Sequence, residues 1–205
     1  MRKQERSNEG SPHSFRPHRG RRRRQRPSHH QLVLVRGRRR WAGDGDWELG
    51  VPSGFAGAPF GGPEPVGGNT GDWAWGTVIG GAHNPSTISS LSQTFDLSGI
   101  VDSELSFAEY SESGGNTFDT AEVIVNGVQL YLSDGNSGLA WRDVVLDLSA
   151  FDGQSEVDVS FVFSTTGVVE RVGWYIDDVT VSGIPTPGAA GLLGVAGLAA
   201  TRRRR

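Results

Sequence analysis

The chain contains no cysteine among its 205 residues, and this absence excludes several kinds of site at once. The protein can form no disulfide framework, hold no metal through thiolates and use no thiol as a nucleophile. Export is not excluded, because an exported protein does not require disulfides. Any site in the protein is therefore built from carboxylates, amides, hydroxyls, histidine or aromatic rings.

Positive charge is almost missing from residues 41–201, which contain only Arg142 and Arg171 against 21 aspartates and glutamates. It is concentrated in residues 1–40, where 14 lysines and arginines face two glutamates, and in the last four residues. An acidic domain repels phosphate, so we expect it not to bind nucleic acid. The same charge suits an extracellular protein that recruits divalent cations.

A long hydrophobic run is missing from the first 40 residues, which are mainly Arg, Pro, His, Ser and Gly. This composition predicts a disordered basic leader. The apolar run at residues 32–35 is shorter than the roughly 7–15 residues of a secretory signal, and arginines follow it, so no signal peptide is legible. A nucleic-acid arm, a targeting leader and a start upstream of the native one remain open, and we favour a non-native or vestigial leader.

Short segments rich in β-branched and aromatic residues follow one another from Trp41 onward, and none has a helical period before residue 188. The expected strands are residues 74–79, 91–97, 104–110, 121–125, 128–132, 141–148, 157–163 and 173–181. Asn126 and Gly127 separate two of these strands, and an Asn-Gly pair in that position indicates a tight hairpin. This pattern predicts an all-β fold over residues 41–183, an antiparallel β-sandwich of the jelly-roll type.

The segment at residues 173–181 places two adjacent aspartates, Asp177 and Asp178, in an otherwise apolar strand. Strict alternation points Tyr175 and Asp177 to one face and Trp174 and Asp178 to the other, so a carboxylate is buried whichever face packs. A buried carboxylate is costly unless it is paired, hydrogen-bonded or bound to a metal. The pair therefore predicts a structural calcium site or a hydrogen-bond anchor, unless both residues lie at a wet end of the strand.

A second acidic segment, at residues 43–50, places Asp44 and Asp46 among glycines. A glycine-rich turn can bring carboxylate oxygens close together, and Ca²⁺ prefers oxygen ligands. The spacing lacks the full pattern of a helix-loop-helix calcium loop. These residues are therefore further, less specific calcium candidates.

Histidine is scarce in the domain, where His83 is the only one; the other four lie in the leader. A Ser-His-Asp arrangement would have to use His83, and no nucleophile-elbow motif is present. We expect His83 to be a surface loop residue without a catalytic role. Acidic pairs are inevitable among so many carboxylates, so they do not indicate a glycosidase, and no phosphate-binding or dinucleotide-binding motif occurs. The sequence predicts a protein that is not an enzyme.

Six tryptophans are present, and most are expected in the core. Trp41, Trp73 and Trp75 lie next to predicted turns or strand starts. Because an aromatic face suits the apolar face of a sugar ring, these three are candidates for a glycan-stacking platform, with core or edge packing as the alternative.

The chain ends with a run of motifs in a fixed order. Pro185, Thr186, Pro187 and Gly188 come first, then twelve apolar residues at 189–200, then Thr201, Arg202, Arg203, Arg204 and Arg205. The apolar run predicts a short helix, below the roughly 20 residues that span a bilayer, and the arginines would be held on the cytoplasmic side as a membrane stop.

This arrangement resembles the PEP-CTERM sorting signal, with Thr186 in place of the usual Glu. The resemblance implies export, transient anchoring in the inner membrane and cleavage at residues 185–188 by an exosortase-type processing enzyme. It also implies a final location at the cell surface or in an extracellular polysaccharide matrix.

Residues 41–182 resemble the jelly-roll domains that follow immune-inhibitor-A-type metallopeptidases and, more loosely, MAM domains. The segments that carry the resemblance are residues 47–50, 75–77, 118–123, 147–154 and 173–179. It implies a structural calcium ion, whose ligands on this chain would be Glu112, Asp119, Asp177 and Asp178, with Asp44 and Asp46 in addition. No peptidase activity follows, because the His-Glu-x-x-His zinc motif is absent.

Taken together, these patterns predict an exported, non-catalytic structural or adhesion protein of the cell surface, sorted by an exosortase-type system. The alternative is a carbohydrate-binding module on a calcium-stabilised jelly roll, with an extracellular polysaccharide as partner.

Overall fold

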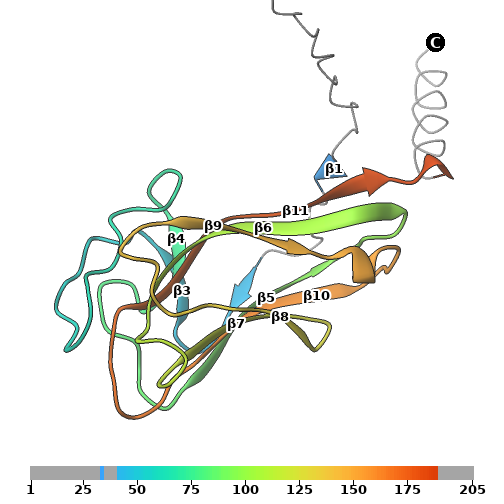
Figure 1. Ribbon diagram of the computed structural model, residues 1–205. Coiled ribbons are helices and arrows are strands. Elements are labelled where there is room, and N and C mark those ends of the chain that lie inside the picture. The colour runs from blue at the N-terminus through green and yellow to red at the C-terminus, as the bar shows by residue number, and fades with distance from the viewer. Residues whose placement is uncertain (1–32, 35–40, 189–205) are drawn as a thin grey trace, which may run out of the picture.

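The computed structural model describes residues 33–34 and 41–188, and these residues form two antiparallel β-sheets packed face to face (Figure 1). The predicted β-sandwich is confirmed. One sheet has the strand order β3-β4-β11-β6-β9, with β1 also paired to β11, and the other has the order β2-β5-β10-β7-β8. The elements are β1 (Val33–Leu34), β2 (Ala42–Gly43), β3 (Trp47–Gly50), β4 (Ala74–Thr77), β5 (Ile88–Phe95), β6 (Ile100–Glu112), β7 (Thr120–Val125), β8 (Val128–Leu132), β9 (Arg142–Asp147), the 3₁₀ turn η1 (Ser149–Phe151), β10 (Val157–Ser164) and β11 (Gly173–Pro185).

Strand β10 shows how the sequence pattern becomes the core. Its apolar residues occur at every second position, so they share one face of the strand. Val157, Val159, Phe161 and Phe163 are all fully buried, as the alternation predicts. Phe161 packs edge-on against Phe107 of β6, with ring centroids 5.0 Å apart, which joins the inner faces of the two sheets.

The hairpin predicted from Asn126 and Gly127 is confirmed. These two residues connect β7 to β8, which pair antiparallel, and both have positive φ angles, 47° and 79°. A two-residue hairpin turn of this kind requires left-handed backbone at both positions, which Asn and Gly tolerate best.

Strand β11 begins buried on both faces, with Trp174, Tyr175 and Ile176 fully buried. The pairing with β6 then shifts between Asp177 and Thr180, where the backbone of Asp178 is left-handed, with φ of 53°. Such a bulge reverses the side-chain alternation beyond it. The strict alternation predicted for this strand is therefore wrong, and no carboxylate is forced inward: Asp177 is half-buried and Asp178 is exposed.

Both ends of the predicted domain extend further than expected. Val33 and Leu34, placed in the disordered leader, form β1 and pair with Gly183 and Ser182 of β11. At the other end β11 continues to Pro185, beyond the predicted end at residue 181.

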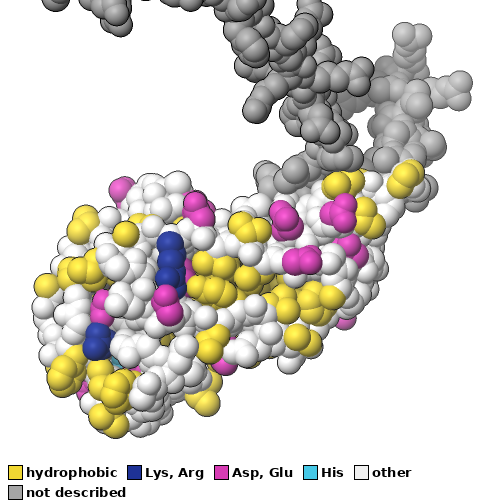
Figure 2. All heavy atoms as spheres, in the orientation of Figure 1, with side chains coloured by type: hydrophobic (Ala, Val, Ile, Leu, Met, Phe, Trp, Pro, Cys, Tyr) yellow, Lys and Arg dark blue, Asp and Glu magenta, His cyan; other side chains and the backbone are white. Residues whose placement is uncertain are grey.

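The edge of the sandwich formed by β8 and β9 is apolar. Figure 2 shows a band of hydrophobic side chains between these two strands, and basic side chains at only two places on this face, each beside acidic ones. Partly buried residues here pack against the core: Leu130, Tyr131, Val144 and Leu146.

Within residues 33–34 and 41–188, no helix is long and apolar enough to cross a membrane.

Candidate functional site

A groove lies at the opposite edge of the sandwich, where β2, β3 and β4 are the outer strands. We call it the tryptophan groove. It has a volume of about 260 Å³ and is lined by Trp41, Leu49, Trp73, Ala74, Trp75, Ile176, Asp177, Asp178 and Val179. The structure thus brings together all three tryptophans and both strand aspartates that the sequence singled out separately.

The three tryptophans are held in different ways. Trp41 packs against Phe95 and Phe161, with ring centroids 6.0 and 5.3 Å apart, so one side of it belongs to the core. Trp75 also packs against the core, and Gly43 is needed beside it, because a Cβ there would lie 2.9 Å from the Trp75 ring. Trp73 is 59% exposed. Trp41 and Trp75 therefore each use part of their surface to pack against the core, while most of Trp73 is accessible to a ligand.

Asp177 and Asp178 hold the loop that carries Trp73. The backbone N–H of Thr70 donates to Asp177 Oδ2 at 3.0 Å, and the N–H of Asp178 donates to Asp177 Oδ1 at 2.7 Å. Asn69 Nδ2 donates to Asp178 Oδ2 at 2.8 Å and the Thr70 hydroxyl donates to Asp178 Oδ1. All four carboxylate oxygens accept hydrogen bonds from the chain, which is the anchor that the sequence offered as an alternative to calcium.

The six calcium candidates are not gathered into one site. Among the described residues, no three His, Asp or Glu side chains lie together in a group able to hold a metal ion. Asp44 accepts from the N–H of Ser90, and Glu112 pairs with Arg171. The strand bulge and the separate loops place these acids apart, so calcium stays a prediction from the sequence and its resemblance.

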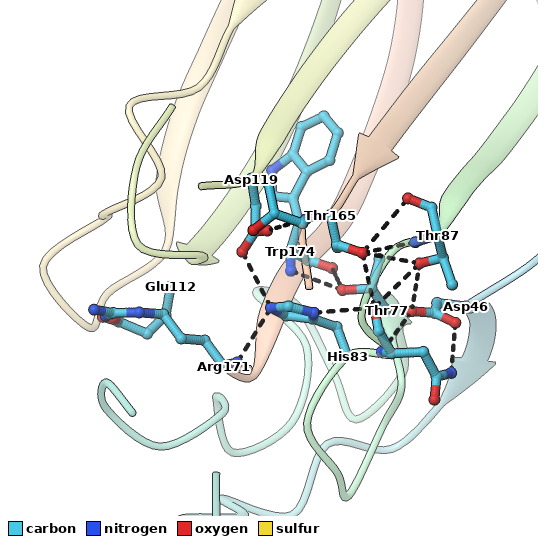
Figure 3. Close-up of polar contacts among 11 residues, drawn as sticks. Asp46, Thr77, His83, Thr87, Glu112, Asp119, Thr165, Arg171 and Trp174 are labelled. Carbon is cyan, nitrogen blue, oxygen red and sulfur yellow. Dashed lines mark hydrogen bonds and ion pairs between the residues drawn. The ribbon is translucent and has the colours of Figure 1, made fainter. Parts of the chain in front are cut away.

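A second polar group, the histidine cluster, consists of Asp46, His83, Asn84, Thr87, Asp119, Thr165 and Arg171. Figure 3 shows His83 at its centre, with Asp119 on one side and Thr87 and Asp46 on the other. His83 is 1% exposed and its ring packs edge-on against Phe163 at 5.3 Å. The prediction of a surface histidine is wrong, because the loop around it turns inward and pairs with the backbone of Arg171.

Asp46 fastens the loop next to His83. Its Oδ1 accepts from Asn84 Nδ2 at 2.7 Å and its Oδ2 accepts from the backbone N–H of Asn84 at 2.9 Å and from the Thr87 hydroxyl at 3.4 Å. A buried carboxylate with this many donors stabilises the loop conformation rather than awaiting a ligand. Asp46 is therefore a structural residue.

Asp119 is the least satisfied member of the histidine cluster. Its Oδ1 accepts from the N–H of Thr166, whereas its Oδ2 has no hydrogen-bond partner and lies 3.3 Å from His83 Nε2. That nitrogen already accepts from the N–H of Arg171 at 3.1 Å. Burial raises the pKa of Asp119, even though the Thr166 N–H, His83 and Arg171 act in the opposite direction. A proton on Asp119 would relieve the unfavourable contact between Asp119 Oδ2 and His83 Nε2, which both act as acceptors.

Two buried glutamates that the sequence did not single out organise the rest of the loops. Glu64 accepts from the N–H groups of Ser53, Phe55 and Gly80 and from the Tyr175 hydroxyl. Burial alone would raise the pKa of Glu64, but these donors outweigh it and lower the pKa. The donors lie up to 111 residues from Glu64 in the sequence, so no local pattern could have identified Glu64 as their shared acceptor.

Glu109 is the other such glutamate and is fully buried. Its Oε1 accepts from Arg142 Nε at 2.6 Å and from the Tyr131 hydroxyl, and its Oε2 accepts from Trp174 Nε1 at 2.8 Å. Burial, followed by the neighbouring carboxylate, raises the pKa of Tyr131 to about 12. The buried glutamates Glu64 and Glu109 thus act as acceptors of internal hydrogen bonds.

The histidine cluster lacks the geometry of a hydrolase. His83 and Asp119 supply two members of a triad, but no hydroxyl among the described residues is hydrogen-bonded to His83, whose Nδ1 lies 3.4 Å from the Asn84 carbonyl oxygen. A nucleophile must be within hydrogen-bond reach of its base. The buried ring is also closed to a substrate.

The predicted sorting segment begins inside the sheet. Pro185 pairs with Ile100, and the Thr186 N–H donates to the Gly99 carbonyl at 2.8 Å. Pro187 and Gly188 are exposed. The apolar run and the arginines Arg202, Arg203, Arg204 and Arg205 lie outside the described residues.

Comparisons with known proteins give similarity in fold alone. No family model matches the chain, and no curated protein matches it. Among solved structures, TmCBM61 in complex with β-1,4-galactotriose has 15% identity and a TM-score of 0.45, with 69% of this chain and 86% of that one covered.

Two further solved structures have comparable similarity. The K1 cleaved adhesin domain of Lys-gingipain from Porphyromonas gingivalis W83 has 12% identity, a TM-score of 0.43 and coverage of 74% and 95%. An apo cyclase from Fischerella sp. has 12% identity, a TM-score of 0.41 and coverage of 76% and 98%. Function therefore has to be argued from the groove itself.

Proposed function

We propose that this domain binds carbohydrate without altering it chemically, and that the tryptophan groove is the binding site. The observation that carries the proposal is the convergence of Trp41, Trp73 and Trp75 on one hollow beside two carboxylates. Ligand sites are concave, mostly apolar and equipped with a few polar groups that fix orientation. This groove has that composition.

The chemistry of a sugar ring fits the two kinds of side chain in the groove. The C–H groups on one face of a pyranose suit the electron-rich face of an indole, and 59% of Trp73 is open to such a contact. Hydroxyl groups around the ring need acceptors, and Asp178 is exposed at the groove. Each of its oxygens has lone-pair capacity beyond the one bond it accepts within the chain.

The size of the groove limits the ligand to a short segment. Its volume of about 260 Å³ is near the lower end of the range of small-molecule pockets. The similar structure TmCBM61 was solved with a galactotriose, a ligand that belongs to that protein. For this chain we propose a polysaccharide, of which a few units occupy the groove.

Replacing Trp73 with alanine tests the proposal. We expect the Trp73→Ala variant to bind a polysaccharide at least about tenfold more weakly, because truncating a central aromatic contact commonly costs about 2 kcal/mol and tenfold corresponds to about 1.4 kcal/mol. Its stability should stay within about 0.5 kcal/mol of the wild type, since most of the ring is exposed. Affinity electrophoresis against a polysaccharide panel, followed by titration calorimetry, measures the change.

Phe60→Ala is the matched control. Phe60 is 53% exposed, a fraction similar to that of Trp73, and it does not line the groove. Its replacement should leave binding unchanged. Equal binding by the wild type and Trp73→Ala, or no binding to any polymer on the panel, would contradict the proposal.

We also propose that the protein is exported and sorted to the cell surface by an exosortase-type enzyme that acts near Pro187 and Gly188. The support is the sequence order of the tail and the position of these two residues, exposed just after the last strand. Deletion of residues 187–205 should release the protein from membrane fractions. The deletion begins at Pro187 because Pro185 and Thr186 bond to the rest of the fold. Unchanged fractionation of the shortened chain would contradict sorting.

A further inference from the structure

We propose that the tryptophan groove selects uncharged polysaccharides and rejects those that carry uronate or sulfate groups. The inference rests on the proposed function and adds the chemical class of the ligand. Its basis is the charge of the groove and of the surface around it, which the aromatic side chains alone do not determine.

The wall of the groove is negatively charged. Asp177 and Asp178 line it, and no lysine or arginine among the described residues does. Both carboxylates act only as acceptors in their hydrogen bonds to Asn69, Thr70 and the backbone, which is the role of the ionised form. An acidic sugar stacked on Trp73 would therefore approach two negative charges, and no lysine or arginine of residues 41–188 lines the groove to offset them.

Within residues 41–188, no cationic side chain is free of a carboxylate partner. The described part of the chain contains two cationic side chains, Arg142 and Arg171. Arg142 is bound to Glu109 and, at 2.6 Å, to Asp134, and Arg171 is bound to Glu112. The Asp134 contact lowers the pKa of that carboxyl. Each arginine is thus already neutralised by its own carboxylates.

The electrostatic field of the whole domain is negative. Residues 41–188 contain twenty-one acidic side chains and only these two arginines. Like charges repel at a distance in dilute salt, and the repulsion fades as salt shortens the screening length from about 30 Å at 0.01 M to about 3 Å at 1 M. Neutral hydroxyl groups experience no such repulsion and can donate to Asp178. The groove should therefore discriminate most strongly at low salt.

The experiment compares one polymer in two charge states. A neutral polysaccharide that binds the full-length protein is partly oxidised at its primary hydroxyls to carboxylates, which leaves the backbone and linkage unchanged. Both forms are titrated into the wild type and into Trp73→Ala. The arginines of residues 1–40 attract any acidic polymer, so binding by the groove is taken as the part that Trp73→Ala removes.

We expect the Trp73-dependent affinity for the oxidised polymer to be at least about tenfold weaker than for the neutral one at about 0.01 M salt, and the ratio to approach one near 1 M. Asp178→Asn should reduce the ratio at low salt, measured with both polymers on the same variant. Equal or stronger Trp73-dependent binding of the oxidised form would overturn the selectivity while leaving carbohydrate binding intact. No Trp73-dependent binding of any neutral or acidic polymer would overturn both.

Discussion

The tryptophan groove and the histidine cluster each contain two aspartates beside an aromatic ring, and they differ in burial. In the groove, Asp178 and Trp73 reach the surface, whereas in the cluster Asp46, His83 and Asp119 are buried. Burial turns a carboxylate into a structural anchor because its lone pairs must be satisfied from within. Exposure leaves part of that capacity to a ligand.

The comparison also explains why so acidic a domain folds. The carboxylates Glu64 and Glu109 accept several internal hydrogen bonds each, and Asp46 does the same in the cluster. Hydrogen bonds to a charged group are stronger than neutral ones. The buried carboxylates thus fix long loops on the sandwich, while Asp178 at the groove is one of the exposed ones.

The largest expected effect separates the two regions by stability. Asp46→Ala should lower the free energy of unfolding by about 3 kcal/mol, because it removes two hydrogen bonds from Asn84 to a buried charged acceptor, each worth about 1.5 kcal/mol or more. Urea denaturation measures this change. Polysaccharide binding by the folded fraction should be unaffected, since Asp46 does not line the groove.

Asp44→Ala is the control for that variant. Asp44 is two residues away, exposed, and accepts one backbone N–H, from Ser90. Its loss should lower the free energy of unfolding by about 1 kcal/mol or less. Similar losses for the two variants would mean that burial does not distinguish the anchors from the surface acids.

A smaller effect, of about 1 kcal/mol, is expected from Asp119→Asn and depends on pH. Since burial raises the pKa of Asp119, the folded state holds this proton more tightly than the unfolded state. Its contribution to stability is fully present below the unfolded pKa, near about 4, and is lost as pH rises through the folded pKa. An asparagine cannot lose a proton, so the variant should gain stability relative to the wild type as pH rises.

Denaturation of both proteins in steps from about pH 4 to about pH 8 measures the difference in unfolding free energy. A difference that falls as pH rises, or stays constant, would contradict the assignment of a raised pKa.

The smallest expected effect concerns calcium at Asp177 and Asp178. Among the described residues, no third acidic or histidine side chain joins them in a group able to hold a metal ion, so EDTA should lower the melting temperature by less than about 2 °C relative to millimolar calcium, equivalent to under about 0.5 kcal/mol. A larger fall, abolished in the variant with Asp177→Asn and Asp178→Asn, would instead establish the calcium site implied by the resemblance.

Features that depend on local pattern could be predicted from the sequence. The alternation in β10 defined one buried face, and Asn126 and Gly127 defined a hairpin, because side-chain period and backbone freedom are properties of neighbouring residues. The succession of short β segments was sufficient to predict the β-sandwich. The sequence also indicated Trp41, Trp73 and Trp75 as candidates, without placing them together.

Features that depend on distant contacts became visible only in the packed structure. Trp41 and Trp73 line one groove with Asp178 because β2, β3 and β4 lie at the same edge of the sandwich and β4 pairs with β11. The bulge turns Asp178 outward, against the predicted alternation. His83 is buried because its loop pairs with Arg171, 88 residues away. Such contacts arise when the two sheets pack. Packing joins segments that are distant in the sequence, and no local sequence pattern indicates that they will be in contact.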